Sequence, residues 1–285
     1  MVRLRSPQVE ILIFGDVMGR VGRRALAAVL PAWKERFHPD LIIANGENLA
    51  HGKGVTESTA QEVFDAGVQL LTGGNHTFEG HGVMMLSHPL WQDRVLRPAN
   101  FSEDRPGKGV VLVDVGGTGV LVVNLLCQVK MFEGELVTNP FTAFDRIVAA
   151  HPEAKIVLVD LHGEITSERV AFGWYAAGRA SAVWGTHTHV PTADTRILPA
   201  PSETARVEGT PGTAYQTDVG MTGFADGVIG IEKKAPLAAF LAGEQLRGAE
   251  MPESGSAVVN ALRITVDPAT GRATHVERLQ EYVTV

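Results

Sequence analysis

Five runs of aliphatic residues in this chain each end at a short polar motif. The runs lead into Asp16, the segment Asn45-Gly46-Glu47-Asn48, the pair Asn75-His76, the pair Asp160 and His162, and the pair His187 and His189. Buried parallel strands read as continuous apolar runs, and ligands of α/β proteins collect beyond the carboxyl ends of such strands. Because every run delivers an Asp, Glu, Asn or His side chain, the pattern predicts one converging metal site in an α/β fold.

The spacing of the first three motifs predicts a repeated strand–helix unit. They fall about 30 residues apart, which is the length of one such unit. Between them, residues 22–37 and 56–66 have helical patterns, with Leu26, Leu30 and Trp33 on one face of the first. Thr56 opens the second with plausible capping chemistry. We therefore expect a mainly parallel sheet with helices on its faces.

The rest of the chain shows no repeat or flexible linker, so we expect a single domain, residues 1–285. The pattern weakens over residues 77–107, where we expect a small cap or insertion. Residues 190–227 are rich in Pro, Gly and Thr, and such a long connection is expected to shape or cover the site. The further elements expected are a hairpin of residues 109–115 and 119–125, helices over 141–150 and 166–177, and a hairpin of residues 257–266 and 273–282.

Charge and composition restrict the class of partner. The net charge of −7 argues against a long nucleic-acid track or an anionic membrane surface, although a phosphate ester can still bind at a locally positive site. No run approaches the roughly 20 apolar residues of a membrane helix. The one cysteine, Cys127, allows no internal disulfide, so a cytoplasmic location is expected.

His187 and His189 carry the most weight among the candidate ligands. Residues two apart on an extended segment point the same way, so both imidazoles are expected to reach one pole of a cavity. Imidazole is a common ligand of Fe, Zn, Cu and Ni. The alternative is a pair of polar loop histidines with no shared ligand.

The carboxylates and amides each have a plain alternative as well. Asp16 is a ligand candidate or a helix N-cap, and the glycines around it do not have the G-x-G-x-x-G spacing of a nucleotide loop. Glu47 can bridge two cations, or it is an exposed turn residue. Asn48 and Asn75 offer neutral carbonyl oxygens, or they are ordinary turn residues.

The remaining histidines divide by context. His162 follows a long strand and is in the position of a ligand. His76 would point differently from Asn75, which suits a residue that faces the substrate or protonates a leaving alkoxide. The others lack a strand-end context and are expected to be surface or structural residues: His38, His51, His81, His88, His151 and His275.

Competing hydrolase motifs are missing from the sequence. A metallo-β-lactamase would need Asp and His after the histidine pair, where Pro191 and Thr192 stand. Amidohydrolase barrels carry their H-x-H after the first strand, and here Asp16 is in that position. The sequence also has no H-E-x-x-H, no cysteine pair and no G-x-S-x-G. Among the hydrolase classes compared, the two-metal phosphoesterases remain.

The order of the motifs resembles that of the calcineurin-like metallophosphoesterase superfamily, which shows D-x-H, G-D-x-x-D, G-N-H-[D/E], a lone His and G-H-x-H. Two departures, Met18 in place of His and Glu47 in place of Asp, resemble one subgroup, the YmdB-like bacterial phosphodiesterases. Further similar segments are Thr166-Ser167-Glu168, Tyr215-Gln216-Thr217-Asp218 and Gly220-Met221-Thr222-Gly223. The resemblance covers essentially the whole chain.

The resemblance implies a four-layer α/β/β/α sandwich and a homodimer or homotetramer. It also implies hydrolysis of 2′,3′-cyclic nucleotides to 3′-phosphate products by attack of a metal-bound hydroxide. Two transition-metal ions per chain are implied, iron first, with Mn, Zn or Mg as alternatives. One ion would be held by Asp16, Glu47, Asn48 and His189, and the other by Glu47, Asn75, His162 and His187, while His76 would face the substrate as the catalytic acid.

Two other functions remain open on the sequence. A regulatory protein would use the same pocket to sense a cyclic nucleotide with little turnover. A phosphomonoesterase or a nuclease acting on short RNA ends would use the same metals, because the charge of −7 weighs only against a long nucleic-acid track.

Overall fold

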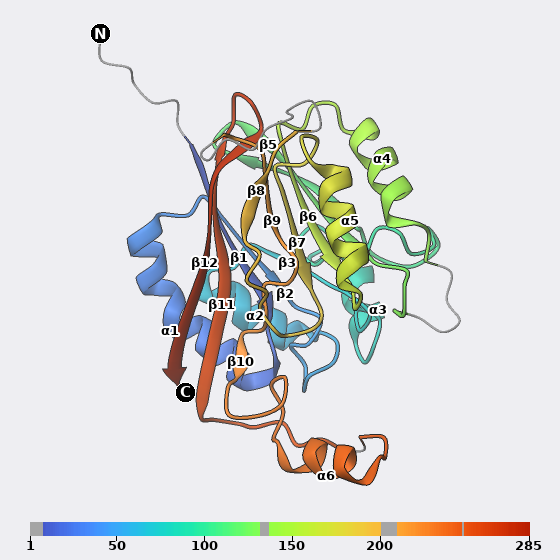
Figure 1. The fold of residues 1–285 in the computed structure, drawn as a ribbon, viewed down its shortest axis with the longest axis vertical. Helices are drawn as coiled ribbons and strands as arrows, with labels where there is room; N and C mark the ends of the chain where they lie inside the picture. The colour runs from blue at the N-terminus through green and yellow to red at the C-terminus, as the bar shows by residue number, and fades with distance from the viewer. Residues whose placement is uncertain (1–7, 132–136, 201–209, 247) are drawn as a thin grey trace.

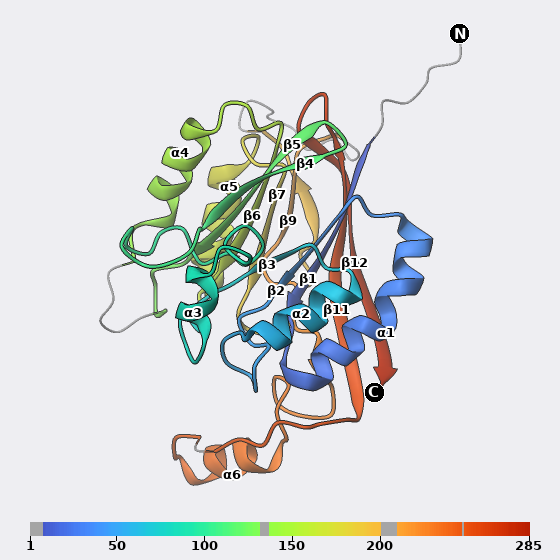
Figure 2. The same ribbon diagram turned by 180° about the vertical axis from the view of Figure 1, so that it is seen from behind.

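The computed structural model describes residues 8–131, 137–200, 210–246 and 248–285. This part of the chain forms two six-stranded sheets that pack face to face, with helices on both outer faces (Figures 1 and 2). The layers therefore follow the order α/β/β/α that the resemblance implied. None of the helices in these ranges is long and apolar enough to span a membrane.

The first sheet is built around the N-terminal strands β1 (Val9–Asp16), β2 (Leu41–Asn45) and β3 (Leu70–Thr72). These three run parallel, with Ile13 opposite Ile43 and Ala44 opposite Leu71. The C-terminal hairpin completes the sheet: β11 (Ser256–Asp267) pairs antiparallel with β1, β12 (Arg272–Thr284) and the short β10 (Gly223–Phe224). The sheet is thus mixed rather than mainly parallel, because the C-terminal hairpin, which is far from β1 in sequence, pairs with it.

The second sheet has the order β4-β5-β6-β7-β9-β8. Its centre is parallel, and its edge pairs β4–β5 and β8–β9 are antiparallel. The strands are β4 (Val110–Val115), β5 (Thr118–Leu126), β6 (Ile156–His162), β7 (Ala182–Thr186), β8 (Arg196–Leu198) and β9 (Thr213–Gln216). Residues 190–227 therefore contribute β8, β9 and β10 to the sheets, whereas their composition suggested only a connection; residues 201–209 of that segment lie outside the described ranges.

Each outer face of the sandwich is covered by two helices. The helices α1 (Gly19–Phe37) and α2 (Glu57–Ala66) cover the first sheet, and α4 (Pro140–Ala150) and α5 (Thr166–Ala176) cover the second (Figure 2). The capping chemistry expected at Thr56 is confirmed, because its hydroxyl accepts from the Thr59 backbone N–H at 3.3 Å while the Thr59 hydroxyl accepts from that of Thr56 at 3.0 Å. Two helices were not predicted: α3 (Gly82–Ser87), within the expected cap, and α6 (Lys234–Ala242), which projects from the body (Figure 1).

Side-chain alternation along the strands produces three apolar layers. In β1, Ile13 points between the two sheets, whereas Phe14 points outward and stacks on Trp33 of α1 with ring centroids 5.6 Å apart. In β6, Leu158 points between the sheets and Val159 packs toward α4 and α5. Both faces of each parallel strand are covered, which is why these strands read as continuous apolar runs. The polar residues that end the runs are left at one end of the sandwich.

We predict that Leu158→Ala destabilises the protein by about 2–5 kcal/mol, because it removes a fully buried side chain from the layer between the sheets. Urea unfolding followed by circular dichroism measures the change. Leu90→Ala is the matched control, because Leu90 is 69% exposed and its truncation should cost little. Equal losses in the two variants would contradict the assignment of the core.

Candidate metal centre

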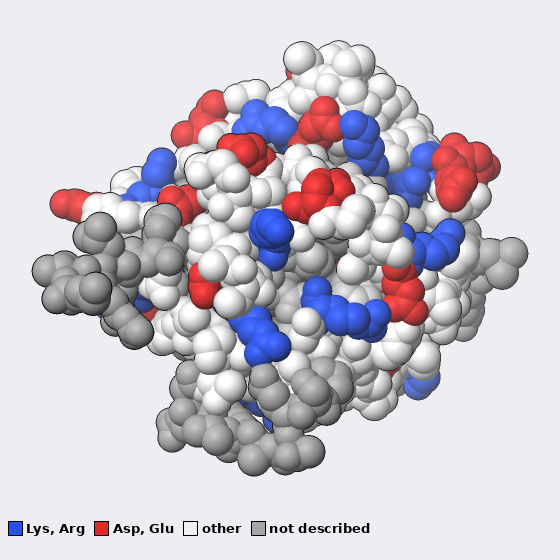
Figure 3. All heavy atoms as spheres, turned by 90° about the horizontal axis from the view of Figure 1, so that it is seen from above, with Lys and Arg blue, Asp and Glu red and all other residues white. Residues whose placement is uncertain are grey.

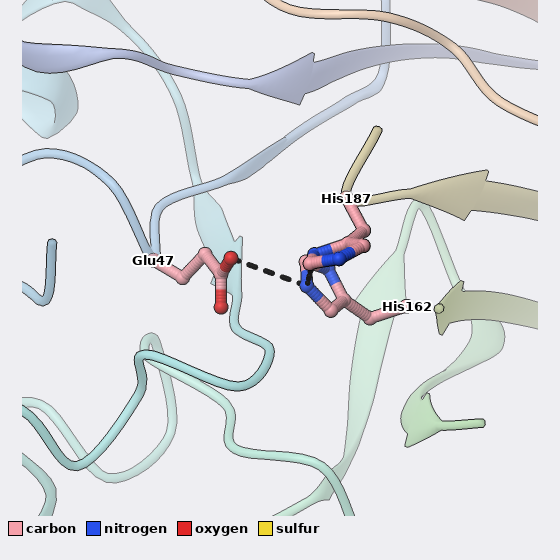
Figure 4. A group of neighbouring side chains, drawn as sticks. All are labelled: Glu47, His162 and His187. Atoms are coloured by element: carbon pink, nitrogen blue, oxygen red, sulfur yellow. Dashed lines mark hydrogen bonds and ion pairs between the residues drawn. The ribbon is translucent and has the colours of Figure 1, made fainter. Parts of the chain in front are cut away.

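The polar motifs of both sheets come together at one end of the sandwich. Asp16 ends β1 and Glu47 follows β2, whereas His162 ends β6 and His187 follows β7. Figure 4 shows Glu47 facing His162 and His187 across the space between the sheets, and ligand atoms of these three lie within 4.8 Å of one another. The site is therefore assembled from residues that are far apart in the chain.

Three side-chain atoms converge on a single ring nitrogen, Nε2 of His162. They are Glu47 Oε1 at 3.1 Å, Asn75 Oδ1 at 2.9 Å and His187 Nδ1 at 3.1 Å. One ring nitrogen has only one proton or one lone pair, so it cannot satisfy three partners. Ligand atoms that each lie about 2.1 Å from a metal are about 3 Å from one another. The spacing of these atoms therefore fits a shared cation.

His162 is oriented by a buried hydrogen-bond relay. Its Nδ1 lies 2.9 Å from the hydroxyl of Thr186, which itself donates to Asp160 Oδ1 at 2.7 Å. The second oxygen of Asp160 accepts from the Thr72 hydroxyl at 2.5 Å. Because the Thr186 proton is directed to Asp160, the hydroxyl oxygen accepts from His162 Nδ1–H, and Nε2 faces the cluster. Such outer partners fix the orientation of ligating histidines.

The charges in this cluster act strongly on one another. Burial raises the pKa of Glu47, but the charge and hydrogen bond of His162 outweigh burial and lower that pKa to about 2. Burial lowers the pKa of His162, but the carboxylates of Glu47 and Asp16 outweigh it and raise that pKa to about 9. Burial, helped by the charge of His162, lowers the pKa of His187 to about 3. The carboxylates thus favour the protonated form of His162. A bound cation would balance their negative charge in place of that proton.

A second group of atoms lies beside the first. Asp16 is fully buried; its Oδ2 accepts from the His187 backbone N–H at 3.0 Å, but its Oδ1 has no hydrogen-bond partner among the described residues. Burial raises the pKa of Asp16. Nε2 of His189 lies 3.9 Å from that free oxygen and 3.2 Å from Asn48 Nδ2. An unpaired buried carboxylate oxygen is costly, and a cation would satisfy it. The carboxylate oxygen and the ring nitrogen of this group fit a divalent transition metal, whereas Asn48 would have to turn its amide to present the oxygen.

The histidine pair reaches the site by a strained turn, and not by the extended segment that we expected. His187 and His189 have φ angles of 111° and 64°, which lie in a region that residues other than glycine rarely adopt. His189 is held by its Nδ1, which donates to the carbonyl oxygen of Ile229 at 2.9 Å. The strain lies within the candidate site, where the surrounding contacts maintain it.

A buried ion pair maintains this turn, and the motif pattern did not reveal it. Asp218 Oδ2 accepts from both the backbone N–H and the hydroxyl of Thr188, at 3.1 and 2.7 Å, and pairs with Arg169 at 2.6 Å. Asp218 and Arg169 are both buried. Arg169 shares the buried face of α5 with Phe172 and Ala176. A charged residue on an otherwise apolar helix face was the signal available in the sequence.

His76 lies at the wall of the cavity and not in the cluster. Its backbone N–H donates to Glu47 Oε2 at 2.9 Å, and its Nδ1 lies 2.6 Å from Glu79 Oε1. Its Nε2 is 3.2 Å from the Asn75 amide nitrogen. Glu79 was missed by sequence reasoning, although it follows His76 by three residues, within reach across one turn.

Motif glycines allow the close approaches that the site requires. A Cβ at Gly74 would lie 2.4 Å from both Glu47 Oε2 and His162 Nε2. A Cβ at Gly15 would lie 1.7 Å from the carbonyl oxygen of Gly220, and one at Gly185 would lie 1.9 Å from that of Thr217. A side chain at any of these positions would displace the atoms that it meets.

The cluster opens into a cavity of about 560 Å³, within the usual range for small-ligand sites. Glu47, Asn48, His76, His187 and His189 line it. His51 also lines it, although the sequence placed that residue with the surface or structural histidines.

A family model described as YmdB-like protein matches residues 12–279. The 2′,3′-cyclic-nucleotide 2′-phosphodiesterase of Bacillus subtilis is 38% identical over 272 residues, which are 95% of this chain and 96% of that protein.

Two solved structures are similar over nearly the whole length. A hypothetical protein from Thermus thermophilus is 37% identical with a TM-score of 0.83, covering 96% of this chain and 99% of that one. A phosphatase from Mycoplasma pneumoniae is 30% identical with a TM-score of 0.85, covering 97% and 94%.

We predict that Gly74→Ala lowers metal affinity by at least about 10–100-fold without unfolding the protein, because the added methyl would lie between Glu47 and His162. Elemental analysis after gel filtration measures bound metal, and circular dichroism checks the fold. Gly119→Ala is the matched control, since its Cβ would meet nothing closer than 3.5 Å. Wild-type metal content in Gly74→Ala would argue against a cation at this point.

Proposed function

The chain belongs to the YmdB-like family, and on that premise we propose that it is a phosphodiesterase that hydrolyses 2′,3′-cyclic nucleotides. The observation that carries this proposal is the convergence of Glu47, Asn75 and His187 on Nε2 of His162, beside the unpaired oxygen of Asp16. Such a set of ligands exceeds what the recognition of a nucleotide alone requires. Water supplies an oxygen to phosphorus, the bond to the 2′-oxygen breaks, that oxygen takes a proton, and a 3′-phosphate remains.

We propose two bound cations, with iron first and Mn, Zn or Mg as alternatives. Asn75, His162 and His187 would hold one; Asp16, Asn48 and His189 would hold the other. Glu47 would bridge them, since its Oε1 faces both sets: it lies 3.1 Å from His162 Nε2 and accepts from the Asn48 amide N–H at 3.5 Å. Divalent cations at such a site neutralise phosphoryl oxygens and acidify water at neutral pH.

His76 is proposed as the group that protonates the leaving 2′-oxygen. Glu79 accepts from its Nδ1–H, which leaves Nε2 as the ring atom for the substrate; Nε2 accepts from the Asn75 amide in the neutral ring and would deliver the proton in the cavity from the imidazolium. The backbone hydrogen bond to Glu47 keeps the same residue in a constant position relative to the ligands. Glu79 thus acts by orienting the ring and does not itself touch the substrate.

The remaining proposals concern the setting of the enzyme. A substrate no larger than a cyclic nucleotide or a short RNA end agrees with the surface in Figure 3, where Lys and Arg are interspersed with Asp and Glu on the described part of that face. We propose a cytoplasmic homodimer or homotetramer in which residues 1–285 act as one domain. The unpaired Cys127 and the exposed apolar residues of α6 support the location and the assembly, respectively.

We predict that Glu47→Gln lowers turnover of 2′,3′-cyclic AMP by at least about 10²–10³-fold, because an amide carries no charge to hold two cations. Product formation over many turnovers measures this, with linear diesters and monoesters as comparison substrates. Glu35→Gln, an exposed change on α1, is the control. Stoichiometric binding with no turnover would favour a sensor, and faster cleavage of monoesters a phosphomonoesterase.

We predict that His76→Ala lowers kcat by about 10²–10⁴-fold but keeps wild-type metal content. Glu79→Gln should lower kcat by about 10-fold, because the ring loses its charged partner but remains in place. The two variants separate proton delivery from orientation. Loss of metal in His76→Ala would instead identify His76 as a ligand.

A further inference from the structure

The catalytic cavity is lined by two kinds of side chain. The candidate metal ligands, His76 and the charged residues Lys53 and Glu164 are polar. Six further lining residues, here called the apolar wall, are apolar: Met18, Ile229, Ile231, Leu246, Ala249 and Met251. A cavity that held only a phosphate and its cations would have no use for an apolar wall, because both prefer polar surroundings.

Part of the apolar wall is packed against the protein. Met18 and Met251 meet over Gly52, where a Cβ would lie 3.1 Å from both Met18 Cε and Met251 Sδ. Met18 and Ile231 are buried, which fixes the base of the wall, whereas Leu246 is 43% exposed at its edge. The two thioethers therefore present a continuous polarisable surface beside the loop that carries Glu47.

Ile229 connects this wall to the ligands. Its carbonyl oxygen accepts the hydrogen bond from His189 Nδ1 at 2.9 Å, while its side chain remains 47% exposed. Its φ is 45°, which is costly for a β-branched residue. In this backbone conformation the carbonyl group of Ile229 faces His189, while its aliphatic side chain lines the cavity. The apolar wall therefore has a constant position relative to the reacting phosphate.

We propose that this apolar wall is the nucleobase subsite of the enzyme, an inference that rests on the proposed function. A cyclic nucleotide has one anionic end and one flat, weakly polar end, which matches the two kinds of lining side chain. The six side chains offer no hydrogen-bonding groups except weakly accepting sulfurs, so they contact the face of the base and do not read its edges. The wall therefore selects bases by face area, favouring purines over pyrimidines and separating adenine from guanine little.

Calorimetric titration of the metal-loaded protein with three reaction products tests the subsite. Adenosine 3′-phosphate, cytidine 3′-phosphate and ribose 3-phosphate share the phosphate and differ in the base. We expect adenosine 3′-phosphate to bind about tenfold more tightly than ribose 3-phosphate, with cytidine 3′-phosphate between them. Leu246→Ser and Met251→Ala should each reduce the tenfold ratio to about threefold. Leu90→Ser, the same change at an exposed leucine that is not among the cavity-lining residues, should leave it at tenfold.

The outcomes separate the subsite from the function. Equal affinity for adenosine 3′-phosphate and ribose 3-phosphate overturns the subsite, while turnover of 2′,3′-cyclic AMP would still support the phosphodiesterase. A tenfold ratio that persists in both Leu246→Ser and Met251→Ala also overturns it. A tenfold ratio that falls in both variants, in a protein without turnover, supports the base subsite and removes the proposed reaction.

Discussion

Buried negative charge at one end of an apolar sandwich is the constraint on which the site depends. Among the described residues, Asp16, Glu47, Asp160 and Asp218 are all buried there. Each carboxylate needs a partner, because an unpaired buried charge costs several kcal/mol. Asp218 has Arg169, Asp160 has the hydroxyls of Thr72 and Thr186, and Glu47 has His162. Only Oδ1 of Asp16 has no hydrogen-bond donor among the described residues. It is therefore the point at which a cation from outside the chain would be stabilised.

The same constraint explains the irregular backbone around the site. The strained turn of His187 and His189 persists because its backbone groups satisfy buried carboxylates: the N–H of His187 binds Asp16, and that of Thr188 binds Asp218. Removing the strain would leave Asp16 Oδ2 without its donor and would take one of three donors from Asp218 Oδ2. The missing side chains at Gly15 and Gly185 serve a related purpose, since carbonyl oxygens of the segment after β9 lie where their Cβ atoms would be.

The elements and ligands that were predictable from the sequence are those encoded by local patterns. Ile13 and Phe14 alternate between two apolar layers, so β1 reads as a buried strand and Asp16 falls at its end. The pairing of β11 with β1 was not readable, because nothing local records which strand a distant hairpin will join. Arg169 and Asp218 were likewise obscure: their roles exist only through a contact between residues 49 apart. Met18 stood out in the sequence only as a departure from the superfamily motif, and Ile229 did not stand out, although both line the cavity.

The origin of the ligands in two different sheets has a mechanical consequence. Asp16, Glu47 and Asn75 belong to the first sheet, while His162, His187 and His189 belong to the second. Elsewhere the sheets adhere through side chains such as Ile13 and Leu158, which are apolar and non-directional. A cation bound at the open end would therefore link the two halves of the sandwich, as a disulfide does in proteins of oxidising compartments. Stripping it would loosen the sheets at their polar end first, and the chain would gain stability with the logarithm of free metal concentration.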